Sequence, residues 1–165
     1  MESSDDDVRW MQLALGVAAS AAAEGEVPVG AVVVREGQLV AVGANTRERA
    51  QDPCGHAEIN ALRAAASVAG EWRLDGCTVY VTLEPCPMCA GAMVLSRVAR
   101  CVYAASDPKG GFLGTLADLS AWPGLNHRFA VTRGVLEAEA SEQLRGFFAK
   151  LRSERRAARR SNEDS

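Results

Sequence analysis

The sequence predicts an α/β fold in which a mixed sheet carries helices on both faces. Segments rich in β-branched and apolar residues alternate with segments of helical periodicity, which is typical of a sheet covered on both sides. The first two strand candidates, 29–34 and 39–42, are separated only by the turn 35–37. They therefore pair as an antiparallel hairpin, and the sheet is not purely parallel.

The N-terminal segment is predicted to form a helix ahead of this hairpin. Between Trp10 and Ala21, apolar residues recur at intervals of three and four positions, which indicates an amphipathic helix. Asp5–Asp7 precede it, where carboxylates interact favourably with the dipole of a helix N-terminus. The polar segment 24–26 ends the helix.

The rest of the chain alternates helices with strands. Proline marks several boundaries: Pro53 lies in a polar loop, and Pro85 and Pro87 end a strand and open a helix. In chain order we expect a loop at 45–55, a helix at 56–69, a strand at 77–83, a helix at 88–95, a strand at 98–104, a loop at 107–114, a short strand at 129–132 and a long helix from 136 onward.

Length and composition indicate one globular domain. A chain of 165 residues with 48% hydrophobic and 24% charged residues is neither disordered nor fibrous. We expect a disordered acidic tail at 1–7, the domain at 8–156 and a frayed tail at 157–165. The apolar runs are too short to span a bilayer, and the N-terminus lacks the basic region of a secretory signal. We therefore expect a cytoplasmic protein without membrane contact, whose five cysteines form no disulfide framework.

The charge is unevenly distributed. The net charge of -3 argues against a uniformly basic nucleic-acid-binding protein. The segment 149–160, however, contains six basic residues and only one acidic residue, which gives it a local net charge of +5. Such a segment can bind a phosphate backbone, because the relevant field is local. The alternative interpretation is a solvated helical tail.

One histidine and two cysteines carry the predicted chemistry. Cys86 and Cys89 are three positions apart at the start of a helix, which puts both sulfurs on one side and stabilises thiolates. His56 supplies a nitrogen from the start of another helix. A structural zinc has four protein ligands, so three donors favour a catalytic zinc with a position left for water. Glu58 can exchange a proton with that water without being a ligand.

Each half of this pattern alone is a weak signal. A lone C-x-x-C suits a redox site or half of a zinc ribbon equally well, and Cys54 is a competing metal ligand. The ordered combination of H-x-E and P-C-x-x-C is specific, because it is typical of zinc-dependent nucleobase deaminases.

These motifs resemble those of the cytidine deaminase superfamily, and more closely those of the bacterial tRNA-specific adenosine deaminases. The resemblance extends over about 8–156. It is carried by Glu26–Val32, His56–Ile59 with Ala61–Arg63, Tyr80–Cys86, Met88–Met93, Asn126–Arg128 and the helix with Phe147 and Phe148.

The resemblance implies a three-layer α/β/α sandwich around a five-stranded mixed sheet, and a homodimer with one zinc ion (Zn2+) per subunit. It implies hydrolysis of the wobble adenosine in a tRNA anticodon loop to inosine, with release of ammonia. By position, His56, Cys86 and Cys89 hold the zinc and Glu58 moves protons. The implied substrate contacts are Asn45 to the flipped nucleotide, Val27, Pro28 and Ala57 to the base, Asp107 and Lys109 to flanking nucleotides, and Phe148 and Arg152 to the anticodon loop.

Two other functions fit the same motifs. A small-molecule deaminase acting on guanine, cytosine or a related nucleobase or nucleotide would share both motifs, although it would have no use for the basic helix. A zinc-stabilised RNA-binding module without catalytic activity is the other alternative. Glu58 and the missing fourth ligand argue against that module.

Overall fold

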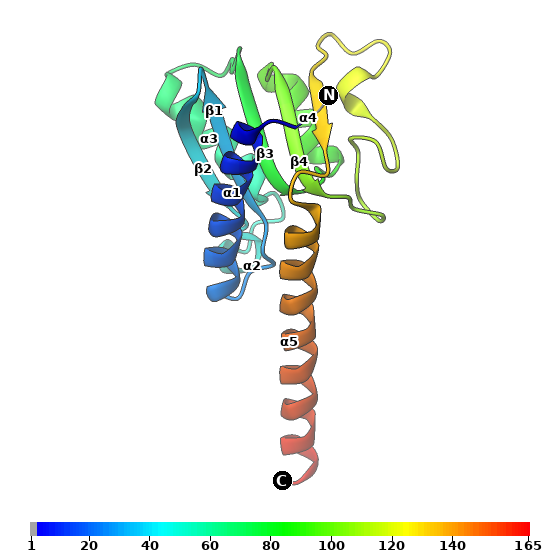
Figure 1. The fold of residues 1–165 in the computed structure, drawn as a ribbon. Helices are drawn as coiled ribbons and strands as arrows, with labels where there is room; N and C mark the ends of the chain where they lie inside the picture. The colour runs from blue at the N-terminus through cyan, green and yellow to red at the C-terminus, as the bar shows by residue number, and fades with distance from the viewer. Residues whose placement is uncertain (1–2) are drawn as a thin grey trace.

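A five-stranded mixed sheet separates two layers of helices in the computed structural model, which describes residues 3–165 (Figure 1). The strand order is β2-β1-β3-β4-β5. β1 pairs antiparallel with β2 and β3, whereas β3, β4 and β5 run parallel. The predicted three-layer α/β/α sandwich is thus confirmed. The strands are β1 (Gly30–Arg35), β2 (Gln38–Ala44), β3 (Cys77–Leu83), β4 (Arg100–Ala105) and β5 (Ala130–Arg133).

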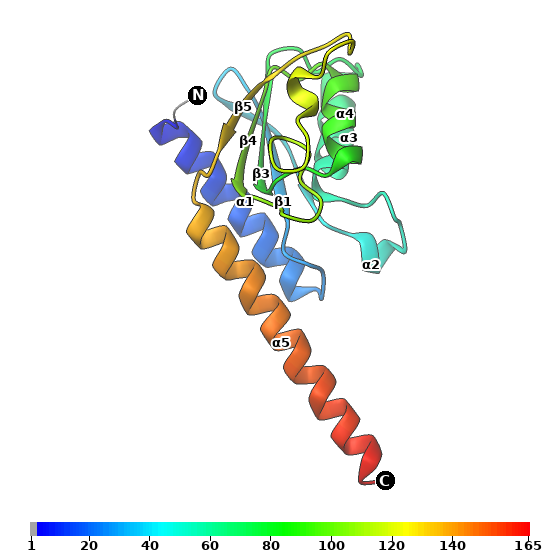
Figure 2. The ribbon, with the colours of Figure 1, turned by 90° about the vertical axis from the view of Figure 1, so that its right-hand side faces the viewer.

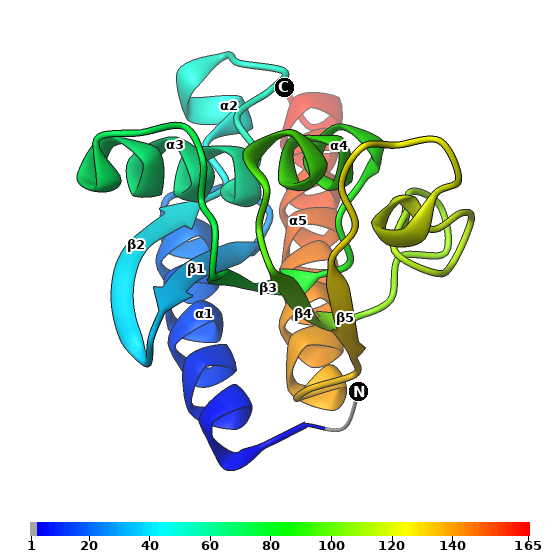
Figure 3. The same ribbon diagram turned by 90° about the horizontal axis from the view of Figure 1, so that it is seen from above.

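The helices divide between the two faces of the sheet, as the view from above shows (Figure 3). α1 and α5 cover one face, and α3 and α4 cover the other, with a separate apolar cluster beneath each pair. The helices are α1 (Asp5–Ala23), the single turn α2 (Arg47–Ala50), α3 (Ala57–Ala69), α4 (Pro87–Ser96), the short 3-10 helix η1 (Leu119–Ala121) and α5 (Glu137–Glu163).

Both expected tails are more ordered than predicted. α1 begins at Asp5, because the Ser4 hydroxyl accepts a hydrogen bond from the Asp7 amide and the Asp7 carboxylate accepts one from the Ser4 amide. The prediction of a disordered segment is therefore wrong for residues 4–7, and its first two residues lie outside the described part of the chain. α5 continues to Glu163, so within the expected frayed segment 157–165 only the last two residues lie outside the helix.

α3 lies unusually close to the sheet. A Cβ at Gly43 of β2 would approach the Ala57 carbonyl and the Ala61 amide of α3 to 2.4 Å, so only glycine fits there. The buried side of α3 includes Ala57, Ala61, Leu62 and Ala65. This close contact fixes the start of α3, which carries the functional residues, against the sheet.

Candidate active site

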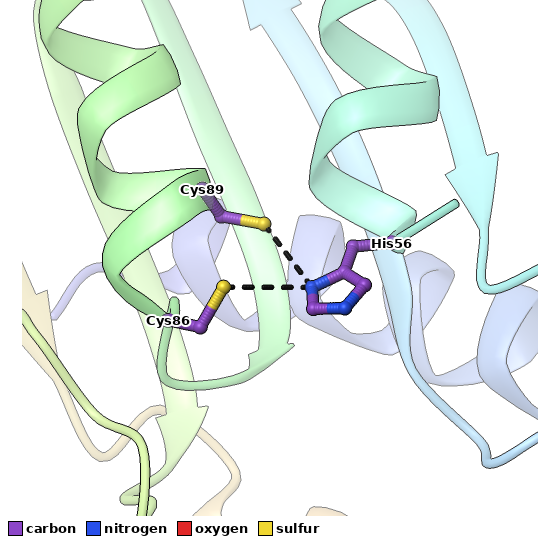
Figure 4. A group of neighbouring side chains, drawn as sticks. All are labelled: His56, Cys86 and Cys89. Carbon is purple, nitrogen blue, oxygen red and sulfur yellow. Dashed lines mark hydrogen bonds between the residues drawn. The ribbon is translucent and has the colours of Figure 1, made fainter. Parts of the chain in front are cut away.

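Two helix N-termini bring three metal-binding side chains together beyond the carboxyl end of β3 (Figure 4). His56 is the N-cap residue of α3, and Cys86 is the N-cap residue of α4. The Nδ1 atom of His56 lies 3.5 Å from the Sγ atoms of both Cys86 and Cys89. All three donor atoms lie within 4.8 Å of one another.

The donor set fits zinc. Tetrahedral zinc with Zn–S bonds of about 2.3 Å and a Zn–N bond of about 2.0 Å separates nitrogen from sulfur by roughly 3.5 Å. The observed separations match this value. Within residues 3–165, no fourth histidine, cysteine or carboxylate joins the group, and Cys54 lies outside it. His56, Cys86 and Cys89 therefore form a three-ligand zinc site.

The two cysteines differ in their protonation in the metal-free protein. The neighbouring Cys89 side chain and His56 lower the pKa of Cys86 to about 4. The neighbouring Cys86 sulfur and burial raise the pKa of Cys89, and the contact with Cys86 raises the pKa of His56. One thiolate is thus ready for a metal, and the second sulfur must lose its proton when the metal binds.

Glu58 reaches the donor group without belonging to it. It lies in the first turn of α3 with 4% of its surface exposed, and its Oε2 atom accepts a hydrogen bond of 2.8 Å from the Cys89 thiol. Burial raises the pKa of the Glu58 carboxyl, although the hydrogen bond from Cys89 acts in the opposite direction. A carboxyl group in this position can take up and return a proton beside the metal.

A cavity of about 280 Å³ opens in front of these residues. This volume is near the lower end of the range for small-ligand pockets. Eight of the residues predicted from the sequence line it: Val27, Asn45, His56, Ala57, Glu58, Cys86, Asp107 and Phe148. Cys89 is buried behind it, Pro28 is buried outside its lining, and Lys109 and Arg152 are exposed beyond its rim.

Four lining residues were missed by sequence reasoning: Val29, Arg47, Leu83 and Glu84. Leu83 and Glu84 directly precede Pro85–Cys86, so the end of the strand was an available signal. Arg47 depends on the folding of a loop. Asn45 shapes that loop, because its amide nitrogen donates to the Val27 carbonyl and its Oδ1 accepts from the Arg47 amide.

α5 extends one side of the cavity into a basic surface. The helix projects far beyond the rest of the molecule (Figure 2). Arg152, Arg155 and Arg159 follow Phe148 by four, seven and eleven positions, which puts all of them on the helix face that borders the cavity. We call this surface the arginine face; its members are Arg152, Arg155 and Arg159.

Comparison with known proteins agrees with this geometry. Residues 4–105 match the family described as the cytidine and deoxycytidylate deaminase zinc-binding region. The tRNA-specific adenosine deaminase of Bacillus subtilis strain 168 is 48% identical over 154 residues, which cover 93% of this chain and 96% of that protein. The chain belongs to the tRNA-specific adenosine deaminase family. Its zinc-binding residues occupy the positions predicted from the sequence.

Solved structures place this family member among related deaminases. One structure comes from work on A-to-I editing by tRNA:A34 deaminases at the wobble position of transfer RNA. It is 41% identical, covers 82% of this chain and 99% of its own, and has a TM-score of 0.80. Guanine deaminase from Bacillus subtilis is 36% identical over 67% of this chain and 70% of its own, with a TM-score of 0.59. The likeness is therefore greater to the tRNA deaminase.

Among residues 3–165, no helix combines the length and apolarity needed to cross a membrane.

Proposed function

We propose that this protein hydrolyses the wobble adenosine of a tRNA anticodon to inosine and releases ammonia. One observation carries the proposal. A three-ligand zinc site with a neighbouring buried carboxylate opens into a cavity, in a chain that is 48% identical to a tRNA-specific adenosine deaminase along nearly its full length. An unpaired anticodon base can enter such a cavity at lower cost than a base stacked in a duplex.

Residues of the chain have three roles in this reaction: metal binding, proton transfer and exclusion of water. His56, Cys86 and Cys89 would hold the zinc, which when bound would supply Lewis acidity and lower the pKa of a water molecule. Glu58 accepts a proton from the attacking water at Oε2 and returns it to the substrate as the amine departs as ammonia. The apolar walls of the cavity, which include Val27 and Leu83, exclude other water from the base.

The substrate contacts follow the shape of the cavity. Asn45 and Ala57 lie in its lining and contact the flipped nucleotide, together with Val27; Pro28 is buried next to Val27 in the chain. Asp107 and Lys109 lie in one loop and contact flanking nucleotides. Phe148 stacks against the anticodon loop at the rim, and the arginine face, beginning at Arg152, binds the phosphates beyond it.

The assignment is tested by direct comparison of substrates. Zinc-loaded protein is incubated with an anticodon stem-loop that bears adenosine at the wobble position, and separately with free adenine, guanine and cytosine. We expect inosine and an equal amount of ammonia from the stem-loop alone. Ammonia from the free bases alone would overturn the assignment.

The second candidate function is deamination of a free nucleobase. The likeness to guanine deaminase favours it, because that enzyme shares the fold over two thirds of this chain. The arginine face discriminates between the two functions, since a free base has no phosphate to bind. Removal of these charges lowers activity only if the substrate is a nucleic acid.

We also propose that the protein is a homodimer that pairs through the outer surface of α3 and α4. A groove between the two helices is lined largely by apolar side chains, including Ile59, Leu62 and Ala92. Trp72 and Leu95 at its edges are 61% and 70% exposed. Large exposed apolar side chains around such a groove are typical of protein–protein contacts, and a second copy presents the same surface.

A further inference from the structure

A second buried carboxylate borders the cavity and is not used by the proposed chemistry. Glu84 has 2% of its surface exposed and lies between β3 and the metal ligand Cys86. Its Oε1 atom accepts hydrogen bonds from the amides of Leu113 and Thr115, each at 3.1 Å. Its Oε2 atom accepts from the Asp107 amide at 3.0 Å and from the Thr115 hydroxyl at 2.5 Å.

The loop at 107–115 is folded around this carboxylate. A Cβ at Gly111 would lie 2.1 Å from Glu84 Oε2, so only glycine allows the loop to pass so closely. The Phe112 amide also donates to the Pro85 carbonyl at 2.9 Å. The loop is thereby attached at both ends and in the middle to the segment that carries Cys86.

The donors to Glu84 are backbone and hydroxyl groups, and within residues 3–165 no ion pair involves it. A buried carboxylate is costly unless its oxygens are hydrogen-bonded, so the four donors and Glu84 stabilise each other's positions. Asp107, at one end of this network, lines the cavity. The position of that wall relative to the metal ligands therefore depends on one side chain.

We infer that Glu84 is a positioning residue that fixes the Asp107 wall of the cavity relative to the zinc site. The inference deepens the proposed function and rests on it, because it assigns to Glu84 an effect on how the flipped base and its neighbours are held. Glu84 itself neither binds metal nor moves a proton.

Glu84→Gln is the informative variant. The amide keeps the volume of the side chain but turns one acceptor oxygen into a donor NH2 group. The least costly orientation directs the NH2 group at the Thr115 hydroxyl, which can turn to accept, and leaves the Asp107 amide without a partner. The amides of Leu113 and Thr115 keep their acceptor.

The experiment measures steady-state kinetics on the wobble-adenosine stem-loop, zinc content and backbone hydrogen exchange. For Glu84→Gln we expect a KM about tenfold higher, a kcat within about threefold of the wild type, one zinc per chain and faster exchange at Asp107. The matched control is Asp7→Asn, which removes a buried hydrogen-bonded carboxylate on the opposite side of the sheet. It should lower stability and leave KM unchanged.

The outcomes separate the possible causes. An unchanged KM in folded, zinc-loaded Glu84→Gln, or an equal rise of KM in Asp7→Asn, would overturn the positioning role. Loss of zinc from Glu84→Gln would do the same, because it would mean that the carboxylate supports the ligands instead. If that variant does not fold, Thr115→Val removes a single donor and should raise KM about twofold to threefold, and an unchanged KM there would count against the inference. Inactivity of the wild type on the stem-loop would refute the proposed function, while hydrogen exchange would still test the link to Asp107.

Discussion

Glu58 allows catalysis and metal binding to be separated by one substitution. Its carboxylate contacts Cys89 but is not among the three metal donors. We expect Glu58→Ala to keep the fold and one zinc per chain, while turnover falls about 10²- to 10⁴-fold through loss of proton transfer. Single-turnover inosine formation and zinc analysis by mass spectrometry measure both properties. Full activity in this variant would refute the proton-transfer role.

Substitution of Cys86 should have the opposite effect on metal binding to substitution of Glu58. Cys86→Ala should lose zinc and unfold at lower temperature, because the metal site joins the start of α3 to the start of α4. Cys54→Ala is the matched control, since Cys54 is exposed and lies outside the donor group, and it should retain its zinc. Stoichiometric zinc in purified Cys86→Ala would show that the ligands are misassigned.

Single residues were predictable where local spacing determines geometry. The spacing of Cys86 and Cys89 at a helix start, together with His56, was enough to identify three zinc donors. The spacing could not identify Arg47 or the role of Glu84. Those residues reach the cavity through loops whose paths depend on long-range hydrogen bonds, such as the bond from Asp107 to Glu84.

At the scale of elements, a buried ion pair holds α1 against β4. Arg100 donates two hydrogen bonds to Asp7, at 2.8 and 2.9 Å, and the Tyr80 hydroxyl donates a third. Burial by itself would raise the pKa of Asp7, but the hydrogen bonds from Arg100, Ser4 and Tyr80 outweigh it and hold the pKa below its ordinary value. The ionised form of Asp7 therefore stabilises the fold.

This pair predicts a pH-dependent difference in stability. Asp7→Asn should lower the free energy of unfolding by about 3 kcal/mol at neutral pH, because it leaves Arg100 without its partner. A lowered pKa means that the stabilisation is complete above the ordinary aspartate pKa of about 3.9 and is lost progressively as the pH falls from there through the lowered pKa of the folded state. Urea unfolding between pH 7 and pH 3 should show the two proteins converging only at the acid end. A constant difference down to pH 3 would contradict this account.

The arginine face predicts how RNA affinity depends on salt. Replacing Arg155 and Arg159 by glutamine should weaken binding to the stem-loop and reduce the slope of log affinity against log salt by about 1 to 2. The control replaces Arg9 and Lys150, which removes the same charge from other surfaces of the protein. Fluorescence anisotropy at several salt concentrations measures the slope. An unchanged slope would mean that this end of α5 is simply a solvated helix.

Helices and strands were predictable where the hydrophobic periodicity agrees with the positions of turn residues and prolines. The hairpin, the strand at 77–83 and the helix after Pro87 all formed near their expected bounds. The start of α1 was missed although its signal is local, because Ser4 and Asp7 form a capping box three positions apart.

At the scale of the whole molecule, the proposed dimer can be tested by placing one charged side chain in its interface. Leu95→Arg puts an arginine at the edge of the groove between α3 and α4, where a second copy would desolvate it. We expect the wild type to sediment as a dimer at micromolar concentration and this variant as a monomer. Leu39→Arg, on the edge strand β2, should remain dimeric. A monomeric wild type would contradict the proposal.

The layered architecture followed from the alternation of helices and strands, and the antiparallel hairpin correctly indicated a mixed sheet. The length of α5 was not predictable in the same way. Its last turns pack on no core residue, so no apolar periodicity marks where the helix ends. The domain bounds of 8–156 stay a prediction.

The central claim is that the zinc site has three protein ligands and one position for water. X-ray absorption spectroscopy of the zinc-loaded protein tests it most directly, because sulfur and lighter ligands scatter differently. We predict two sulfur atoms at about 2.3 Å, and one nitrogen and one oxygen at about 2.0 Å, with the oxygen still present in Glu58→Ala. Three or four sulfur ligands would show a closed structural site and contradict the account.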